Sequence, residues 1–183
     1  MRKKVSYKVA LGGIVSALSL VAMIMSGVIP GLEYAIPAFA GIVLVIIVIE
    51  IGMSWAFLTY AGVALLSFFV VPNKEASLLF ITFMGYYPII KSVFETKIKA
   101  RPLQWFVKII LFNIALVVYY NLVMLLVSSP ELKQSIDEIG KFALPLLIGA
   151  ANVVFVIYDI AVTNLITMYI KWFRKKVIRH LDK

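Results

Sequence analysis

Six long apolar runs constrain this chain more than any other feature. Of its 183 residues, 63% are hydrophobic and 15% are charged, whereas only about half of the residues of a soluble domain are apolar. A hydrocarbon core about 30 Å thick needs roughly 20 apolar residues per helix. The sequence therefore predicts an all-α integral membrane protein, a single domain with transmembrane helices at 9–29, 35–51, 53–71, 76–94, 105–127 and 142–170.

The boundary between the second and third spans needs an argument. From Ala35 to Val71 the chain is apolar apart from Glu50. One helix of that length would be about 55 Å long, at 1.5 Å per residue, which is too long for one crossing. We therefore expect the chain to fold back at the stretch Glu50–Ser54. Merging the two runs would leave an odd number of crossings and put the termini on opposite sides.

The distribution of positive charge predicts the orientation. If each run crosses the bilayer once, 15 of the 18 Lys and Arg residues lie on one side, and only Lys74, Lys133 and Lys141 lie on the other. By the positive-inside rule both termini are cytoplasmic, in a multi-pass protein of the cell membrane. The basic tail, 171–183, would continue the last helix or lie along the inner surface. The net charge of +9 then reflects topology and contact with membrane lipid, and it requires no nucleic acid.

The basic start followed by an apolar stretch also has to be weighed against a signal peptide. The stretch Val9–Ile29 is longer than the usual hydrophobic region of a signal sequence, which has about 7–15 residues. We interpret it as a retained first helix.

Polar side chains inside the predicted spans are candidates for a binding site, because a charge in the bilayer is costly and usually faces a cavity or a partner. Asp159 lies near the middle of the last span, and Asn152 precedes it by seven residues, on the same helix face. The fifth span carries Asn113 and Asn121, with Tyr120 beside them. These five residues could line a pocket that opens outward. The alternative is that they only form hydrogen bonds between helices.

Three further features carry weaker predictions. Glu50 and Lys91 lie near the predicted cytoplasmic interface, so we expect interfacial anchors or a salt-bridge pair. The stretch Gly85–Pro88 should kink the fourth helix, because proline frees a backbone carbonyl. The outer loop 128–141 could cover the external face as a lid or be an ordinary solvated loop.

The first helix has a face of small residues. Gly12 and Ser16 form one small-xxx-small pair, and Gly13 and Ala17 form a second. Such a face lets another helix approach closely. It could pack against a neighbour in the same chain or dock a separate protein.

The sequence contains no enzyme signature. It has no cysteine and a single histidine, His180, and it has no Walker motif, HExxH motif or nucleophile beside a base. We therefore expect no catalytic activity, no metal and no cofactor. Because it has no ATP site, energy-driven transport would need a separate ATPase.

In layout the chain resembles the S components, the substrate-binding subunits, of energy-coupling-factor transporters. The resemblance is carried by Ala10–Ala17 after a basic start, by Ile29-Pro30 and Ile36-Pro37 at the first turn, and by Glu50–Ala56 at the inner turn. It implies that Gly13 and Ala17, and less closely Gly12 and Ser16, dock on a transmembrane coupling subunit that works with ATPases.

The resemblance also implies capture of a vitamin or similar micronutrient from outside, with Asn121, Asn152 and Asp159 near the pocket. The leading hypothesis is thus a micronutrient-binding membrane subunit. The alternative is a structural or regulatory membrane protein without a small-molecule ligand.

Overall fold

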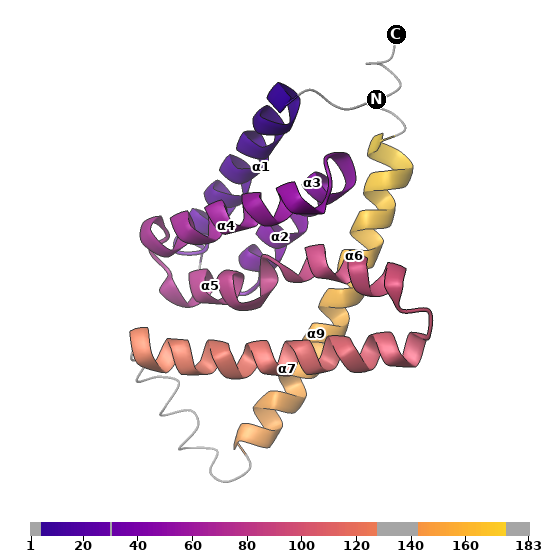
Figure 1. The fold of residues 1–183 in the computed structure, drawn as a ribbon. Coiled ribbons are helices and arrows are strands. Elements are labelled where there is room, and N and C mark those ends of the chain that lie inside the picture. The colour runs from indigo at the N-terminus through magenta and orange to yellow at the C-terminus, as the bar shows by residue number, and fades with distance from the viewer. Residues whose placement is uncertain (1–4, 30, 128–142, 175–183) are drawn as a thin grey trace.

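The computed structural model describes residues 5–29, 31–127 and 143–174, and all regular elements in these ranges are helical (Figure 1). In chain order they are α1 (Val5–Met25), α2 (Ala35–Val43), α3 (Val45–Glu50), α4 (Met53–Val70), α5 (Lys74–Leu79), the π-helical turn η1 (Phe80–Met84), α6 (Tyr87–Lys97), α7 (Arg101–Leu126), α9 (Ala143–Met168) and the π-helical turn η3 (Tyr169–Arg174). The predicted outer loop, 128–141, and the tail beyond Arg174 lie outside the described residues.

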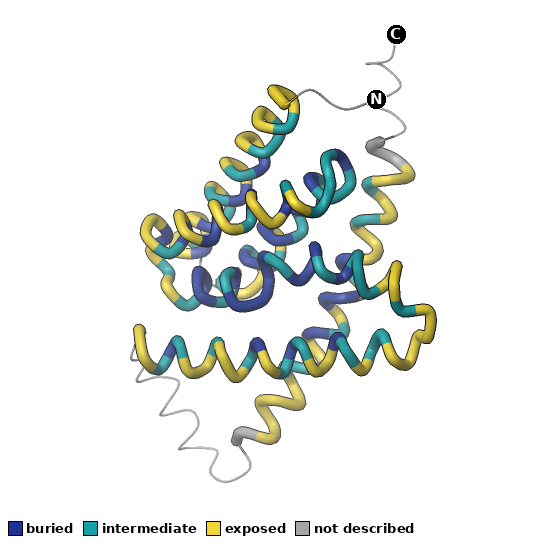
Figure 2. The backbone as a smooth tube through the Cα atoms, in the orientation of Figure 1, coloured by how far each residue is buried: buried dark blue, intermediate teal, exposed yellow. Residues whose placement is uncertain are grey.

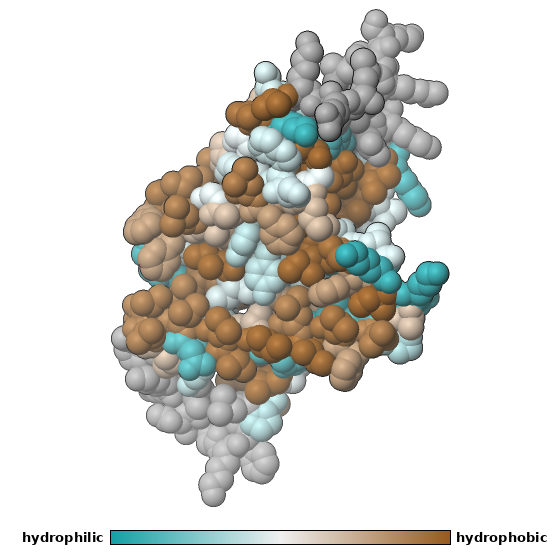
Figure 3. Space-filling view, in the orientation of Figure 1, coloured by the Kyte–Doolittle hydropathy of each residue, from teal (hydrophilic) through white to brown (hydrophobic). Residues whose placement is uncertain are grey.

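Five helical stretches are long and apolar enough to cross a membrane: Val5–Met25, Met53–Val70, Lys74–Lys97, Arg101–Leu126 and Pro145–Lys171. A sixth apolar stretch, Ala35–Glu50, is shorter and would span about 24 Å at 1.5 Å per residue. Most of the surface visible in Figure 3 is hydrophobic, as expected where lipid replaces water around the helices. The predicted class, an all-helical protein with membrane-type helices, is confirmed.

The interior of the bundle is formed by the shorter elements. The stretch Lys74–Lys97 is the most buried of the five long ones, and α2 and α3 contribute Ala40, Leu44 and Ile47, which have no exposed surface. By contrast, α1, α4, α7 and α9 expose one side along most of their length (Figure 2). One apolar core lies between α1, α2, α3 and α4, and a second, largely aromatic core lies between η1, α6, α7 and α9.

The predicted fold-back between the second and third spans is confirmed. Helix α3 ends at Glu50 and α4 begins at Met53. Between them Gly52 has φ +116°, a conformation that is unfavourable for a residue with a Cβ atom. A glycine at this position therefore lets two apolar helices reverse direction within two residues.

The predicted break at Gly85–Pro88 is also confirmed. The chain passes from the π-helical turn η1 through Gly85 into α6, and Pro88 has no N–H to donate to the carbonyl of Met84, four residues earlier. This carbonyl lies 3.5 Å from the hydroxyl of Tyr158. It also lies against α2, because a Cβ atom built on Gly41 would be only 1.9 Å from the Met84 oxygen. The break thus lies where α2 approaches this stretch closely, at Gly41.

The other helices begin and end within a few residues of the predicted spans, with two extensions. Helix α1 begins at Val5 rather than at residue 9, and the last helix continues through η3 to Arg174. The helix ends also fall into two groups in Figure 1. The α3–α4 turn and the α6–α7 connection lie toward the right of the view, and the α4–α5 connection and the end of α7 lie toward the left.

Candidate functional site

Helix α6 carries one stripe of polar side chains. Tyr87, Lys91 and Glu95 follow one another at intervals of four residues, so they lie on the same face of the helix. The break before α6 turns this face toward α7 and α9. Tyr87 and Lys91 have no exposed surface, whereas the Glu95 side chain is 37% exposed. The stripe therefore runs from the bundle interior to its surface at the α6–α7 connection.

Asp159 of α9 is the centre of a buried ion cluster. Its Oδ1 accepts hydrogen bonds from the Tyr87 hydroxyl at 2.5 Å and from the Lys91 ammonium. The ammonium of Lys108, on α7, lies 3.1 Å from Oδ1 and 3.2 Å from Oδ2. Glu95 completes the cluster, 2.7 Å from Lys91 and 2.8 Å from Lys108. Two ammonium groups thus face two carboxylates, and the cluster joins three helices.

This arrangement corrects the prediction for Lys91. We expected an interfacial anchor or a partner of Glu50, but Lys91 is fully buried and its ion pairs are with Glu95 and Asp159. Lys108, which was counted among the orienting cytoplasmic charges, is also buried in this cluster. The i, i+4 spacing of Tyr87, Lys91 and Glu95 was the one signal in the sequence that could have indicated a shared face.

Aromatic rings cover the ion cluster on its inner side. The ring of Phe83 stacks on Tyr87, with centroids 4.6 Å apart, and the rings of Phe112 and Phe155 stack at the same distance, nearly parallel. Tyr158 is buried beside them. Such a wall holds water away from one side of the charges, and a low local dielectric strengthens both the attraction within a pair and the penalty for an unpaired charge.

Two of the predicted site residues meet directly. The side-chain amides of Asn113, on α7, and Asn152, on α9, exchange hydrogen bonds of 3.0 and 3.2 Å. Each Nδ2 also donates to the carbonyl four residues earlier, Ile109 and Ile148 respectively, at 2.8 Å. All four N–H groups are therefore used, and with respect to the described residues each amide oxygen retains one free lone pair. Because Asn152 and Asp159 both contact α7, the prediction that they share a helix face is confirmed.

The structure does not bring Tyr120 and Asn121 into this group. Both side chains are exposed, and among the described residues Asn121 donates only to the carbonyl of Val117 in its own helix, at 2.7 Å. They lie about 10 Å farther along α7 than Asn113, toward the opposite end from the ion cluster. Of the five predicted residues, three thus form contacts between α7 and its neighbours, and two lie on its open surface.

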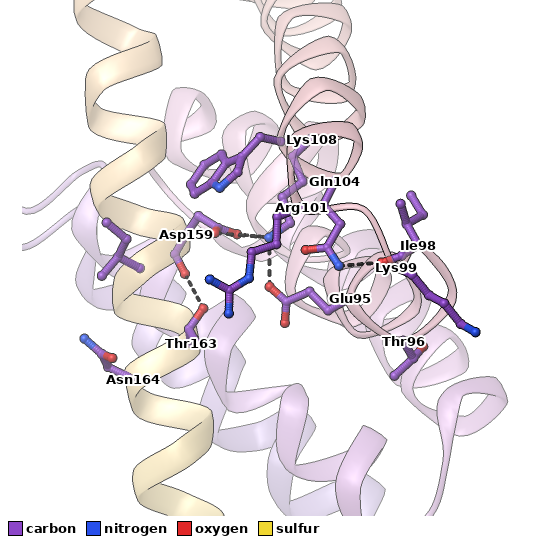
Figure 4. Close-up of a pocket in the computed structure, with 12 residues that line it drawn as sticks. Glu95, Thr96, Ile98, Lys99, Arg101, Gln104, Lys108, Asp159, Thr163 and Asn164 are labelled. Carbon is purple, nitrogen blue, oxygen red and sulfur yellow. Dashed lines mark hydrogen bonds and ion pairs between the residues drawn. The ribbon is translucent and has the colours of Figure 1, made fainter.

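A cleft of about 620 Å³ opens next to the ion cluster, between the α6–α7 connection and α9 (Figure 4). Its lining residues come from three elements: Glu95, Thr96, Ile98 and Lys99 from the end of α6 and the connection, Arg101, Gln104, Trp105 and Lys108 from α7, and Asp159, Ile160, Thr163 and Asn164 from α9. The Lys108 ammonium lies 5.3 Å from the centre of the Trp105 ring. This cleft is at the end of the bundle predicted to face the cytoplasm. The sequence-based prediction placed the pocket at the other end.

A second, smaller cleft of about 300 Å³ lies at that other end. It is lined by Ser26, Gly27, Ile29 and Glu33 near the first turn and by Pro72 and Asn73 near the α4–α5 connection. The side chain of Asn73 caps α5 through a hydrogen bond of 2.9 Å from the Ala76 amide. None of the five predicted site residues lines this cleft.

The small-residue face of α1 divides into two parts. A Cβ atom on Gly12 would lie 3.6 Å from the Thr59 hydroxyl of α4, so Gly12 faces the interior of the bundle. A Cβ atom on Gly13 would meet nothing within 4 Å, and Ala17 is exposed. Ser16 is half-buried between them. The Gly12 side thus packs internally, and the surface formed by Gly13 and Ala17 is open among the described residues.

Comparison with protein families, with curated proteins and with solved structures finds no match. Function must therefore be argued from the arrangement of the side chains.

Proposed function

We propose that this chain is a membrane-embedded substrate-binding subunit for uptake of a small polar molecule, such as a vitamin or similar micronutrient, working with a separate coupling subunit and ATPases. We also propose six membrane crossings, one of them by the short α2–α3 stretch. In this arrangement the protein lies in the cell membrane and both termini are cytoplasmic. It is supported by the grouping of helix ends at two sides of the bundle (Figure 1) and by the positive-inside rule.

One observation carries the proposal: polar side chains follow the contact between α7 and α9 through much of the bundle. They include the Asn113–Asn152 pair, the ion cluster around Asp159 and the polar cleft at one end, whereas Asn121 lies farther along the exposed surface of α7. The other half of the bundle has an apolar core. Charged and amide groups within a membrane protein are expensive to bury and commonly mark a path or a binding site. The free lone pairs of the two asparagine oxygens suit a ligand with hydrogen-bond donors.

The open surface formed by Gly13 and Ala17 supports the proposed coupling partner. A helix from another protein can approach closely only where side chains are small. Because Gly12 already packs toward Thr59, the two glycines would have separate tasks, one inside the chain and one in the transporter complex.

A structural or regulatory role is the second candidate, and the saturation of Asp159 favours it. Three donors of the same chain occupy this carboxylate. The cluster could therefore serve only to fix α6, α7 and α9 relative to one another.

Native mass spectrometry of the purified full-length protein tests the proposal. A binding subunit should retain a small molecule of defined mass and lose it after Asn152→Ala or Asn121→Ala. Asn121 is the sharper probe, because within the described part of the chain it is bonded only to its own helix. Its removal should therefore leave the melting temperature nearly unchanged. The matched control is Thr167→Ala. Thr167 is also exposed, and its hydroxyl donates to the carbonyl of Thr163 in its own helix, near the C-terminal end of α9. If no molecule is retained, or if all three variants retain it equally, the binding role is refuted and the structural role is favoured.

A further inference from the structure

The cleft beside the ion cluster contains more positive than negative charge. Its two carboxylates, Glu95 and Asp159, are already paired with Lys91 and Lys108. Lys99 and Arg101 also line the cleft, and both are exposed. No acidic side chain among the described residues forms an ion pair with either of them. Two cations of the cleft therefore have no counter-charge within these parts of the chain.

Arg101 is the cation aimed into the cleft. In Figure 4 its guanidinium group points across the space toward α9, near Thr163, whereas Lys99 points away. Arg101 is the first residue of α7, and no side chain caps this helix start. The positive end of the helix dipole and the unpaired amide groups of the first turn therefore add to the positive potential of the guanidinium.

The opposite wall of the cleft offers further hydrogen-bonding groups. The Thr163 hydroxyl donates to the carbonyl of Asp159 at 3.0 Å, and the exposed Asn164 amide makes no hydrogen bond with the described residues. A group bound beside Arg101 would thus meet the planar fork of the guanidinium, with the Thr163 hydroxyl facing it and the Asn164 amide farther along the same wall. A tetrahedral anion with several oxygens matches this geometry, because guanidinium groups bind such oxygens in pairs.

We propose that this cleft binds a phosphate group, held by Arg101 against the polar wall formed by Thr163 and Asn164. The apolar surroundings favour a phosphate carried by an anionic membrane lipid. Ile98 and Ile160 line the cleft, and Leu103 and Phe106 of the same end of α7 are exposed, so acyl chains can lie beside the headgroup. At the predicted cytoplasmic side, anionic headgroups are also attracted by neighbouring basic residues. A free phosphate ion or phosphate ester is the other possible source of the same chemistry.

Lipid retention tests the proposal directly. The full chain is reconstituted in nanodiscs of mixed phosphatidylglycerol and phosphatidylcholine, and the lipids that remain bound are counted by native mass spectrometry. The wild type should retain phosphatidylglycerol in preference to phosphatidylcholine. Arg101→Gln should weaken this retention about tenfold, as expected for the loss of a charge-assisted hydrogen-bonded contact. Arg101→Lys should fall between the two, because it keeps the charge and loses the fork.

Lys97→Gln is the matched control. Lys97 is exposed in the last turn of α6 and does not line the cleft, so this variant removes the same charge from the same connection. It should retain phosphatidylglycerol as the wild type does. Asn164→Val, from the opposite wall, should weaken retention independently of charge. Equal losses in Arg101→Gln and Lys97→Gln would overturn the proposal, because they would show a diffuse electrostatic effect.

A second arm distinguishes the source of the phosphate. In nanodiscs of phosphatidylcholine alone, added inorganic phosphate should raise the melting temperature of the wild type, and not of Arg101→Gln, if the cleft takes a soluble phosphate. Preference for phosphatidylglycerol without any effect of inorganic phosphate supports the lipid source. If the wild type shows neither response, the cleft is not a phosphate site.

Discussion

Replacing Asp159 by asparagine tests whether the ion cluster stabilises the bundle as one charge-balanced unit. The substitution preserves the shape of the side chain and removes its charge. Lys91 and Lys108 then share a single carboxylate, that of Glu95, and Lys91 has no exposed surface through which to reach water. Removing one partner of a buried ion pair costs about 3–5 kcal/mol. We expect a loss of stability in that range.

The second half of this prediction is a rescue. Lys91→Met removes one cation and leaves Asp159 bonded to Tyr87 and to Lys108 at 3.1 Å, so it should cost less, about 1–3 kcal/mol. In the double variant Asp159→Asn/Lys91→Met, Lys108 and Glu95 remain as one positive and one negative charge, 2.8 Å apart, so the cluster again has no net charge. The two changes should therefore be less than additive, with a coupling energy of about 2 kcal/mol.

Equilibrium unfolding in detergent micelles, followed by circular dichroism, measures these four stabilities. Lys97→Met is the control, because it removes an exposed cation of the same helix that forms no ion pair with the residues the structure describes. It should change stability by less than about 0.5 kcal/mol. Where Asp159→Asn does not fold well enough for measurement, recovery of folded protein in the double variant reports the same rescue. Strict additivity of the two changes would refute the idea of a balanced cluster.

Three shorter predictions follow from the helix contacts. Gly41→Ala should destabilise the protein by about 2 kcal/mol or more, because the added Cβ atom would lie 1.9 Å from the backbone oxygen of Met84. The control is Gly62→Ala, whose Cβ atom would meet nothing within 4 Å. This variant should be neutral or slightly stabilising in thermal melts. Gly13→Leu should abolish co-purification with a coupling subunit without lowering the melting temperature. Gly12→Leu should lower the melting temperature, because Gly12 faces α4. Equal melting temperatures for the two variants would contradict the division of this helix face. Asn152→Ala should cost about 0.6–2 kcal/mol, the typical contribution of a hydrogen bond between membrane helices, and a melting temperature equal to that of the wild type would show that its contact with α7 is energetically neutral.

Several local features of the fold were readable from the sequence because each has a local cause. Gly52 permits a tight reversal wherever the rest of the chain goes, and Pro88 removes a helical hydrogen bond regardless of its neighbours. The same holds for Asp159, which is unusual in an apolar run whatever its partner is. These predictions needed only the chemistry of one residue and the hydropathy of those around it.

The partners of the polar residues were less accessible. Lys91 was expected at an interface because it lies close to the end of an apolar run, and Lys108 was counted among the orienting charges for the same reason. Both are buried against Asp159, which is 68 residues from Lys91 and 51 residues from Lys108 in the sequence. Position along a run indicates depth in the membrane, but it does not indicate which way a side chain points.

By itself, the sequence determined that the chain forms long apolar helices of membrane-spanning type, where these helices break, and which polar residues lie among apolar ones. These properties follow from hydropathy and backbone chemistry close to each residue. The tertiary structure alone decided that Asp159 is shared by two lysines, that Asn113 faces Asn152, and that the large polar cleft lies beside the α6–α7 connection. These outcomes depend on the rotation of each helix about its axis and on the crossing of α7 by α9. Both are set by packing between segments far apart in the chain, such as the close approach of Gly41 to Met84.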